Sequence, residues 1–261
     1  MRIVVIVKEV ADTEAVISLK DGLPDLSQTA MVNNPYDEYA VEEALQQADK
    51  LGDCTVTAVM VGREKSKENL RKILAMGVND AVLIDDEALA GADPLQIAQV
   101  LKVAIEPLEP AFILAGRQGV DYDWGLAPLA LAELMGWGHV GLIAKLEIND
   151  GQFKAETEGD DGLLTFEGSL PAVFTADKSL NEPRYPSLKG IMQAKKKPLE
   201  TKSLADLGLD GAAVGGAAAG VKLLSCNYPP SKEAGRLIEG ETAAEKAAAL
   251  VKALREEAKV I

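Results

Sequence analysis

The chain has 261 residues and a formal net charge of −14 at pH 7, and 48% of its residues are hydrophobic while only 4% are aromatic. This negative charge repels phosphate backbones and acidic membrane surfaces, so nucleic-acid binding is not expected, and no apolar run approaches the roughly 18 residues of a membrane-spanning helix. The first residues, MRIVVIVKEV, predict a strand rather than a signal peptide, which favours a cytoplasmic protein without membrane insertion.

Short apolar strands and amphipathic helices alternate over the first half of the chain. Strands are expected at residues 2–8, 54–61, 81–84 and 111–115, and helices at 39–51, 65–76, 94–105 and 126–135, the first of them capped by Asn34 or Asp37. Such alternation is typical of parallel strands joined by right-handed helical crossovers. We therefore expect an α/β fold with a mostly parallel sheet flanked by helices.

After about residue 138 the pattern changes to short β-like runs, at residues 140–148, 153–158, 163–166 and 172–175. Polar joints such as NDGQ predict an antiparallel addition to the same sheet. Residues 208–220 (GLDGAAVGGAAAG) predict a flexible connection, and residues 242–259 an amphipathic helix that needs a surface to pack on. We expect one domain over residues 1–207, followed by a link and a C-terminal arm over 208–261.

The residue types that commonly carry metal or acid–base chemistry are sparse. Cys54 and Cys226 stand far apart and match no metal-ligand spacing, which indicates a reducing compartment and no metal site. His139 is the only histidine and no nucleophile motif accompanies it, so we expect no catalytic residue. Beside Gly138, it is interpreted as a hydrogen-bonded turn residue.

Three segments that follow predicted strands are expected to meet at one edge of the sheet. They are residues 8–13 (KEVADT), 34–38 (NPYDE) and 116–125 (GRQGVDYDWG). The helix after the third segment would offer free amides to a phosphate, whereas Asp121 and Asp123 favour a hydroxyl or amide partner, or cap the helix. No dinucleotide or P-loop motif is present, so a nucleotide site and an ordinary turn both remain open.

Residues 180–198, LNEPRYPSLKGIMQAKKKP, combine three prolines with a lysine cluster and place the apolar Leu188 between Ser187 and Lys189. One interpretation is a surface loop leading into a helix, with the lysines complementing the helix dipole on a solvated face. The other is a docking element. The residues alone leave both open.

Residues 170–197, LPAVFTADKSLNEPRYPSLKGIMQAKKK, closely resemble the signature region of the electron-transfer flavoprotein beta subunit. Further stretches follow the order of that family: VIVKEVAD at 5–12, NPYDEYAVEEAL at 34–45, LRKILAMGVNDAVLI at 70–84 and AGRQGVDYD at 115–123. The resemblance covers essentially the whole chain.

The resemblance implies an adenine-nucleotide-alpha-hydrolase-like, Rossmann-like domain in a heterodimer, with the C-terminal arm wrapped around an alpha subunit. It implies an electron relay from a dehydrogenase, often of the acyl-CoA type, through FAD to a quinone-reducing acceptor protein. The alpha subunit would hold most of the FAD, with the loops near Thr13 and Tyr36 approaching the flavin ring. Such a protein is an electron carrier rather than a substrate-converting enzyme.

The resemblance also assigns a role to residues 180–197, which correspond to the recognition loop of the family. Leu188 would enter an apolar pocket of the dehydrogenase, and the neighbouring lysines would steer the encounter with an acidic partner surface. Glu158 matches a family glutamate that makes this surface productive. The expected docking residues are Leu188, Glu158, Tyr185, Pro186, Ser187 and Lys189.

A nucleotide site in this subunit is implied as well, and AMP in a structural role is its expected occupant. Many family members carry a Thr-Gly or Thr-Ala-Gln element after the acidic pair, whereas this chain has WGLAP at 124–128, so a hydroxyl is missing and an indole could fill the adenosine volume. The expected cofactor-binding residues are Ile6, Val7, Lys8, Thr13, Asn34, Pro35, Tyr36, Asp37, Val61, Gly62, Asp121, Asp123, Trp124, Gly125, Leu126, Ala127 and Pro128.

Two alternatives stand beside the non-bifurcating carrier. One is a bifurcating form that oxidises NADH and holds a second FAD in this subunit; the flavin count per heterodimer separates the two. The other is a stand-alone nucleotide-binding module of the universal-stress type, which only the general α/β pattern supports.

Overall fold

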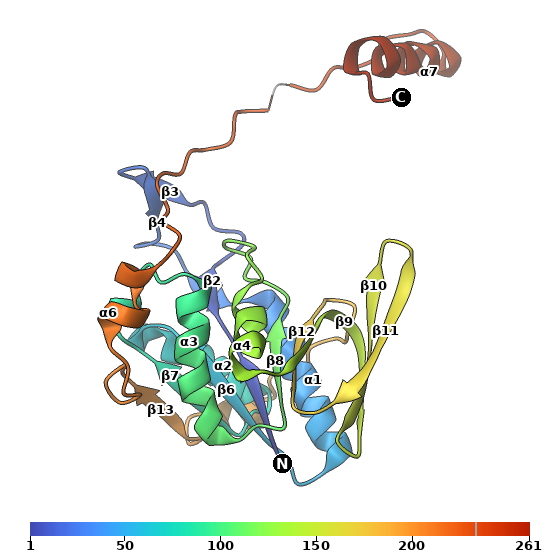
Figure 1. Ribbon diagram of the computed structural model, residues 1–261. Coiled ribbons are helices and arrows are strands. Elements are labelled where there is room, and N and C mark those ends of the chain that lie inside the picture. The colour runs from blue at the N-terminus through green and yellow to red at the C-terminus, as the bar shows by residue number, and fades with distance from the viewer. Residues whose placement is uncertain (233) are drawn as a thin grey trace. The chain divides into compact units, whose positions relative to one another are not determined.

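The computed structural model describes residues 1–232 and 234–261 (Figure 1). The chain divides into two compact units, Met1–Ser225 and Cys226–Ile261, and each is described by itself. In the described part of the chain, no helix has both the length and the apolar character needed to cross a membrane.

The first unit is built on a nine-stranded sheet, counted over the described residues, with the order β11-β10-β9-β12-β8-β1-β6-β7-β13. Parallel pairing joins β1 to β6 and β8, β7 to β6 and β13, and β12 to β8 and β9, whereas β10 is antiparallel to β9 and β11. The strands are β1 (Arg2–Ile6), β6 (Thr55–Val61), β7 (Asp80–Ile84), β8 (Phe112–Gly116), β9 (Gly138–Asn149), β10 (Gln152–Gly159), β11 (Gly162–Ser169), β12 (Ala172–Ala176) and β13 (Leu199–Lys202).

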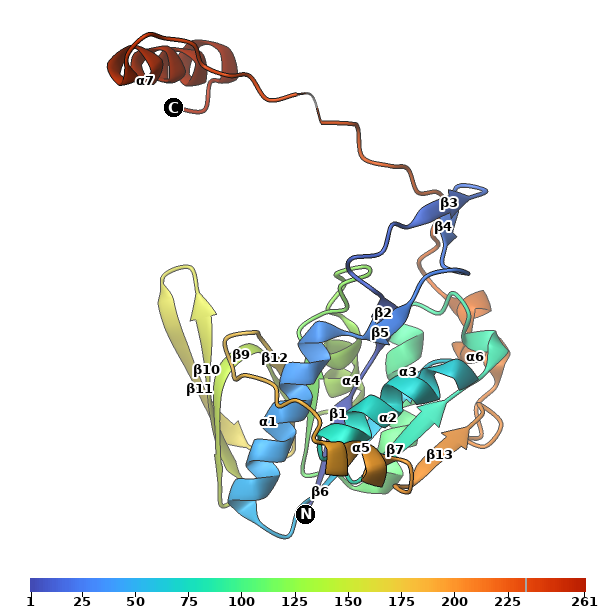
Figure 2. The same cartoon turned by 180° about the vertical axis from the view of Figure 1, so that it is seen from behind.

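Helices cover both faces of the sheet, because successive strand residues point to opposite sides and are apolar on both. On one side, Ile3 and Val5 pack with α1 (Pro35–Leu51) and α2 (Lys67–Met76). On the other, Val4 packs with α3 (Pro94–Ile105) and α4 (Ala127–Met135). Figure 1 shows α3 and α4 in front of the sheet, and Figure 2 shows α1 and α2 from the reverse side. The predicted α/β class with a mostly parallel sheet is confirmed.

The position of the strand at 172–176 differs from the prediction of an antiparallel addition. β12 lies between β8 and β9 and runs parallel to both. All five of its residues are buried, and a short continuous apolar run of this kind is typical of a central parallel strand. Only the β9–β10–β11 part is antiparallel.

Several short elements were not predicted, because three or four residues carry too little periodicity to be recognised. The strand pairs are β2 (Glu9–Ala11) with β5 (Met31–Asn33) and β3 (Ser18–Lys20) with β4 (Leu23–Asp25). The short helix α6 (Gly211–Val214) and the 3-10 turns Glu64–Ser66, Glu87–Leu89, Glu106–Leu108 and Gly216–Ala218 were not predicted either, whereas α5 (Leu188–Ala194) is the helix that the loop interpretation of residues 180–198 expected.

The prediction that residues 208–220 form a flexible connection is wrong. Asp210 caps α6, Val214 is buried, and the amide of Gly220 donates to the Asp93 carboxylate at 2.8 Å. Glycine permits this packing, since a Cβ at Gly216 would clash with the carbonyl of Ala90. The first unit therefore extends past the boundary predicted at residue 207, as far as Ser225.

The second unit contains the predicted C-terminal helix. α7 (Ala243–Lys252) begins with a capping box, in which the Thr242 hydroxyl accepts from the Glu245 amide and the Glu245 carboxylate accepts from the Thr242 amide. It continues as a wider π-helical turn over Ala253–Ala258. No residue of α7 is buried.

Candidate functional site

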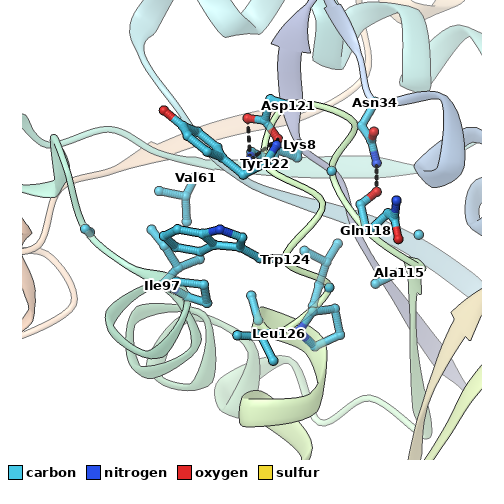
Figure 3. Close-up of a pocket in the computed structure, with 18 of the residues that line it drawn as sticks. Lys8, Asn34, Val61, Ile97, Ala115, Gln118, Asp121, Tyr122, Trp124 and Leu126 are labelled. Carbon is cyan, nitrogen blue, oxygen red and sulfur yellow. Dashed lines mark hydrogen bonds and ion pairs between the residues drawn. The ribbon is translucent and has the colours of Figure 1, made fainter. Parts of the chain in front are cut away.

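A cavity of about 840 Å³ opens at the carboxyl ends of β1, β6 and β8, where ligands bind in open parallel sheets (Figure 3). Most of the predicted cofactor-binding residues line it: Ile6, Val7, Lys8, Asn34, Asp37, Val61, Asp121, Trp124, Gly125, Leu126, Ala127 and Pro128. Five others are not among its lining residues: Thr13, Pro35, Tyr36, Gly62 and Asp123.

The carboxylate of Asp37 ties three strand-end segments together beneath this cavity. It accepts hydrogen bonds from the backbone amide of Lys8 at 2.7 Å, from Asn34 Nδ2 at 2.9 Å and from the backbone amide of Gly116 at 3.1 Å. Position 116 has no room for a side chain, because a Cβ there would clash with this carboxylate. The end of β1, the start of α1 and the end of β8 therefore meet at one buried group.

Burial raises the pKa of Asp37 from its usual 3.8 to about 7, against the opposing effect of the hydrogen bonds from Asn34, Lys8 and Gly116. The folded protein consequently holds a proton at Asp37 more tightly than the unfolded chain does. The stability that this carboxyl contributes is full below about pH 3.8 and is lost as the pH rises through about 7.

Asn34 holds the loop between β8 and α4 in place. Its Nδ2 donates to the carbonyl of Gln118 at 2.8 Å, and its Oδ1 accepts from the amide of Val120 at 3.1 Å (Figure 3). Asn34 does occupy the N-cap position of α1, but its side chain makes no capping hydrogen bond there. The predicted cap therefore serves the cavity loop instead of the helix.

Neither aspartate of this loop caps α4, whose N-cap position is Leu126. Asp121 forms an ion pair with Lys8 Nζ at 2.6 Å at the cavity wall, and Asp123 accepts from Gln118 Nε2 at 2.7 Å. Lys8 is half-exposed, so its ion pair contributes only about 0–1 kcal/mol to stability. The two carboxylates shape the loop rather than the start of the helix.

Trp124 forms part of the cavity wall beside Val61 and Ile97 (Figure 3). Its ring centroid lies 5.5 Å from that of Tyr122, and the side chain is 42% exposed. The indole thus leaves the cavity open and presents an aromatic face, a suitable surface for a planar heterocycle to stack on.

Gly125 turns the chain from this loop into α4. Its φ of +58° lies in the left-handed region, and a Cβ would approach the Arg117 carbonyl oxygen to 2.9 Å, so a side chain is disfavoured twice. The turn brings Ala127 and Pro128, at the start of α4, to the cavity. A helix N-terminus carries partial positive charge and favours an anionic ligand group.

The remaining wall was not predicted. It comes from the start of α3 and from residues 216–223, which the Asp93 carboxylate anchors by accepting from the amides of Gly220 and Val221. The Asp93–Pro94 pair is a helix-start signature after a strand and could have indicated the α3 wall. No local signal marks residues 216–223, because only packing brings them there.

The predicted docking residues 185–189 lie together on the surface. Tyr185 is 96% exposed and Leu188 83% exposed, while Ser187 caps α5 by accepting from the Gly190 amide at 3.0 Å. Lys189 is also exposed and Pro186 is half-buried. Glu158 lies elsewhere, as an exposed residue of β10 that pairs across the ladder with Leu163.

The loop interpretation placed the lysine cluster at 195–197 on a solvated face, but only part of the cluster is solvated. Lys195 and Lys196 are exposed, but Lys197 Nζ donates to the carbonyls of Leu74 at 2.9 Å and Val78 at 2.5 Å. Burial lowers the pKa of Lys197. This lysine therefore satisfies carbonyls at the end of α2 rather than facing a partner.

The histidine and the cysteines form no site in the described residues. His139 lies in β9, and its buried Nε2 has no hydrogen-bond partner among the described residues. The prediction that His139 is a hydrogen-bonded turn residue is therefore wrong. Burial lowers its pKa. Cys54 and Cys226 are free, and over residues 1–232 and 234–261 no group of three His, Cys, Asp or Glu side chains could hold a metal ion.

Comparison with known proteins gives consistent matches. Residues 27–207 match the electron transfer flavoprotein domain family. The chain is 43% identical to an electron transfer flavoprotein subunit beta of Bacillus subtilis and 36% identical to one of Bradyrhizobium diazoefficiens, each over 100% of both chains. It is 34% identical to one of Methylophilus methylotrophus over 98% of both chains. The chain therefore belongs to the electron transfer flavoprotein beta-subunit family.

Proposed function

We propose that this beta subunit and its alpha subunit together hold FAD and relay electrons from an acyl-CoA-type dehydrogenase to a quinone-reducing acceptor protein. Family membership implies the alpha subunit and a flavoprotein context, whereas the donor, the acceptor and the exact cofactors belong to the proposal. When bound, FAD supplies the redox chemistry. The subunit itself contributes binding surfaces and orientation.

The observation that carries this proposal is the exposure of Leu188 at the start of α5, between Ser187 and Lys189. The side chain is 83% exposed and lies outside both hydrophobic cores. Burying one leucine in a partner pocket stabilises a complex by roughly 1.5–3 kcal/mol, which holds a partner but allows its release. Pro183 and Pro186 restrict the backbone, so less entropy is lost on docking.

Leu188→Ala is expected to raise the flavoprotein concentration needed for half-maximal flavin reduction by about tenfold, because it removes one buried apolar anchor. The measurement is the rate of flavin reduction by an acyl-CoA dehydrogenase and its substrate against heterodimer concentration. Leu95→Ala, on an exposed leucine of α3 on the other side of the sheet, is the matched control. An unchanged concentration dependence in the Leu188 variant would show that this segment does not dock.

For the cavity we propose AMP in a structural role. Support comes from the Trp124 ring face for the base and from the start of α4 for the phosphate. The hydroxyl that many relatives carry after the acidic pair is missing, and one lost donor weakens a phosphate site by roughly 0.5–1.5 kcal/mol without abolishing it. A volume of about 840 Å³ leaves room for a nucleotide.

Acid extraction of the purified heterodimer, followed by nucleotide chromatography, is expected to release one AMP per FAD. The expectation follows from a cavity that the tryptophan borders without filling. FAD alone would mean that Trp124 moves inward and excludes the base. Two FAD and no AMP would support the bifurcating, NADH-oxidising alternative.

We also keep a cytoplasmic location within the proposal, supported by the two free cysteines. The stand-alone universal-stress-type module loses its basis, because it rested on the general α/β pattern alone and the chain belongs to the electron transfer flavoprotein beta-subunit family.

A further inference from the structure

The segment that connects β12 to α5 crosses the outer surface of α1 (Figure 2). There the Glu42 carboxylate, whose side chain is only 5% exposed, accepts three hydrogen bonds from Arg184. They come from Nε at 2.8 Å, from Nη2 at 3.1 Å and from the backbone amide at 3.1 Å. A buried carboxylate on a helix surface is costly unless it is paired in this way.

A neighbouring contact fastens the same crossing. Asn181 Nδ2 donates to the Tyr39 carbonyl at 3.0 Å and to Glu43 Oε2 at 3.3 Å. Two successive acidic residues of α1 are therefore buried under the segment and both contact it. The start of the segment is fixed before the chain reaches Tyr185.

A second set of contacts holds the other end on α2. Arg71 Nη1 donates to the carbonyls of Ala194 at 2.6 Å and Lys197 at 2.8 Å. Gly190 lies so close to α2 that a Cβ would clash with the carbonyl of Ala75. α5 is thus held against α2 from its first turn to its end.

Between the two attachments the segment presents an apolar surface. Leu188, Ile191 and Met192 follow helical i, i+3 and i+4 spacing and are 83%, 47% and 73% exposed, next to Tyr185 at 96%. A short loop carrying such side chains would otherwise sample many conformations and lose that freedom on docking.

We propose that Glu42 and Arg71 are positioning residues that hold this surface in one docking-ready conformation for the dehydrogenase. The inference rests on the proposed docking function of Leu188, and it assigns a purpose to buried charges that fold stability alone does not require. Glu42 is buried and Arg71 is half-buried within the subunit. They act through the backbone of residues 181–197, which they fix from opposite ends.

The test compares heterodimers that carry Glu42→Gln, Arg184→Lys, Asp49→Asn or Leu188→Ala. Glu42→Gln keeps the shape of the side chain but removes its charge. Arg184→Lys keeps the charge but removes the guanidinium group that donates two hydrogen bonds to Glu42. Because Arg184 is half-exposed and lies outside the core, we expect this variant to fold. Asp49, which is 74% exposed and lies 3.6 Å from Arg184 Nη2, is the matched control for charge.

Two quantities are measured for each variant: the heterodimer concentration at half-maximal dehydrogenase-driven flavin reduction, with the maximal rate, and the backbone hydrogen exchange of residues 181–192. Glu42→Gln and Arg184→Lys are each expected to raise the half-maximal concentration by about tenfold, the equivalent of one charge-assisted hydrogen bond, with the maximal rate unchanged. Exchange should increase in residues 181–192 only. Asp49→Asn should change neither quantity by more than about twofold.

Unchanged hydrogen exchange in both Glu42→Gln and Arg184→Lys would overturn the inference whatever the kinetics. The inference would also be overturned if Glu42→Gln and Arg184→Lys left the half-maximal concentration unchanged while Leu188→Ala raised it. In that case the proposed docking function would stand. If Leu188→Ala also has no effect, the docking function fails, and the positioning role fails with it.

Discussion

A chain truncated after Ser225 is expected to fold but to form no stable heterodimer with the alpha subunit. The buried hydrophobic residues all lie at or before Val214, so the truncation leaves the core of the first unit intact. α7 buries none of its residues, and a ten-residue helix is marginal in water unless it packs on another surface. We infer that this surface belongs to the alpha subunit.

We expect a complete loss of pairing with the alpha subunit. After co-expression the truncated chain should elute alone on size exclusion, and the eluted alpha subunit should retain less FAD. Circular dichroism would verify that the first unit remains folded. Removal of residues 259–261 alone is the matched control and should leave pairing intact, because it spares α7. Normal co-elution of the longer truncation would contradict the assigned role of the arm.

Asp37→Ala is expected to lower the free energy of unfolding by about 3 kcal/mol, because it leaves several donors beneath the cavity without an acceptor. These donors are the amides of Lys8 and Gly116 and the side chain of Asn34. Since folding raises the pKa of this carboxyl from 3.8 to about 7, the loss should be larger at about pH 4 than at about pH 8.

Denaturant unfolding of the isolated subunit at both pH values measures this loss. Asp25→Ala removes a partly exposed carboxylate of β4 that accepts from the Ser27 amide at 3.0 Å, and it should change the free energy of unfolding by less than about 0.5 kcal/mol. If Asp37→Ala lowered the free energy of unfolding by less than about 1 kcal/mol, or by an amount that grows with pH, the hydrogen-bonding role of Asp37 would be contradicted.

The regular elements could be predicted where local signals agree. The helix at Pro94–Ile105 has a capping Asp93, a proline at its first position and a clear apolar stripe, and its predicted bounds match those of the structure. Strand order could not be predicted for residues 172–176, because the sequence reports that a run is buried but not which strands flank it.

The segment at 208–220 shows why composition misled. Glycine and alanine remove the side chains that normally fill a core, yet they also allow the backbone to pack directly on its neighbours at Ala88 and Ala90. The buried Glu42 and Glu43 of α1 are a second case. Helical periodicity treats such residues as solvent-facing, whereas residues 181–184 cover them from more than a hundred positions away.

About half of the candidate site could be predicted from the sequence. Strands of a parallel sheet end at a common edge, so we could expect three segments to meet there: the residues after β1, the residues after β8 and the segment that leads into α1. The cavity does bring Lys8, Asn34 and Asp121 together. The wall formed by residues 216–223 depends on long-range hydrogen bonds, in which the Asp93 carboxylate accepts from the amides of Gly220 and Val221 and Gln96 Nε2 donates to the carbonyl of Ala218. No spacing or motif reports such a contact.

The most direct test of the whole account is the flavin content and reducibility of the complex obtained by co-expressing this chain with its alpha subunit. We expect a yellow heterodimer with one FAD per pair, whose absorption spectrum bleaches when an acyl-CoA dehydrogenase and its substrate are added. A colourless chain that elutes as a monomer or homodimer, with no flavin and no alpha subunit, would contradict the assignment of this protein as one half of an electron carrier.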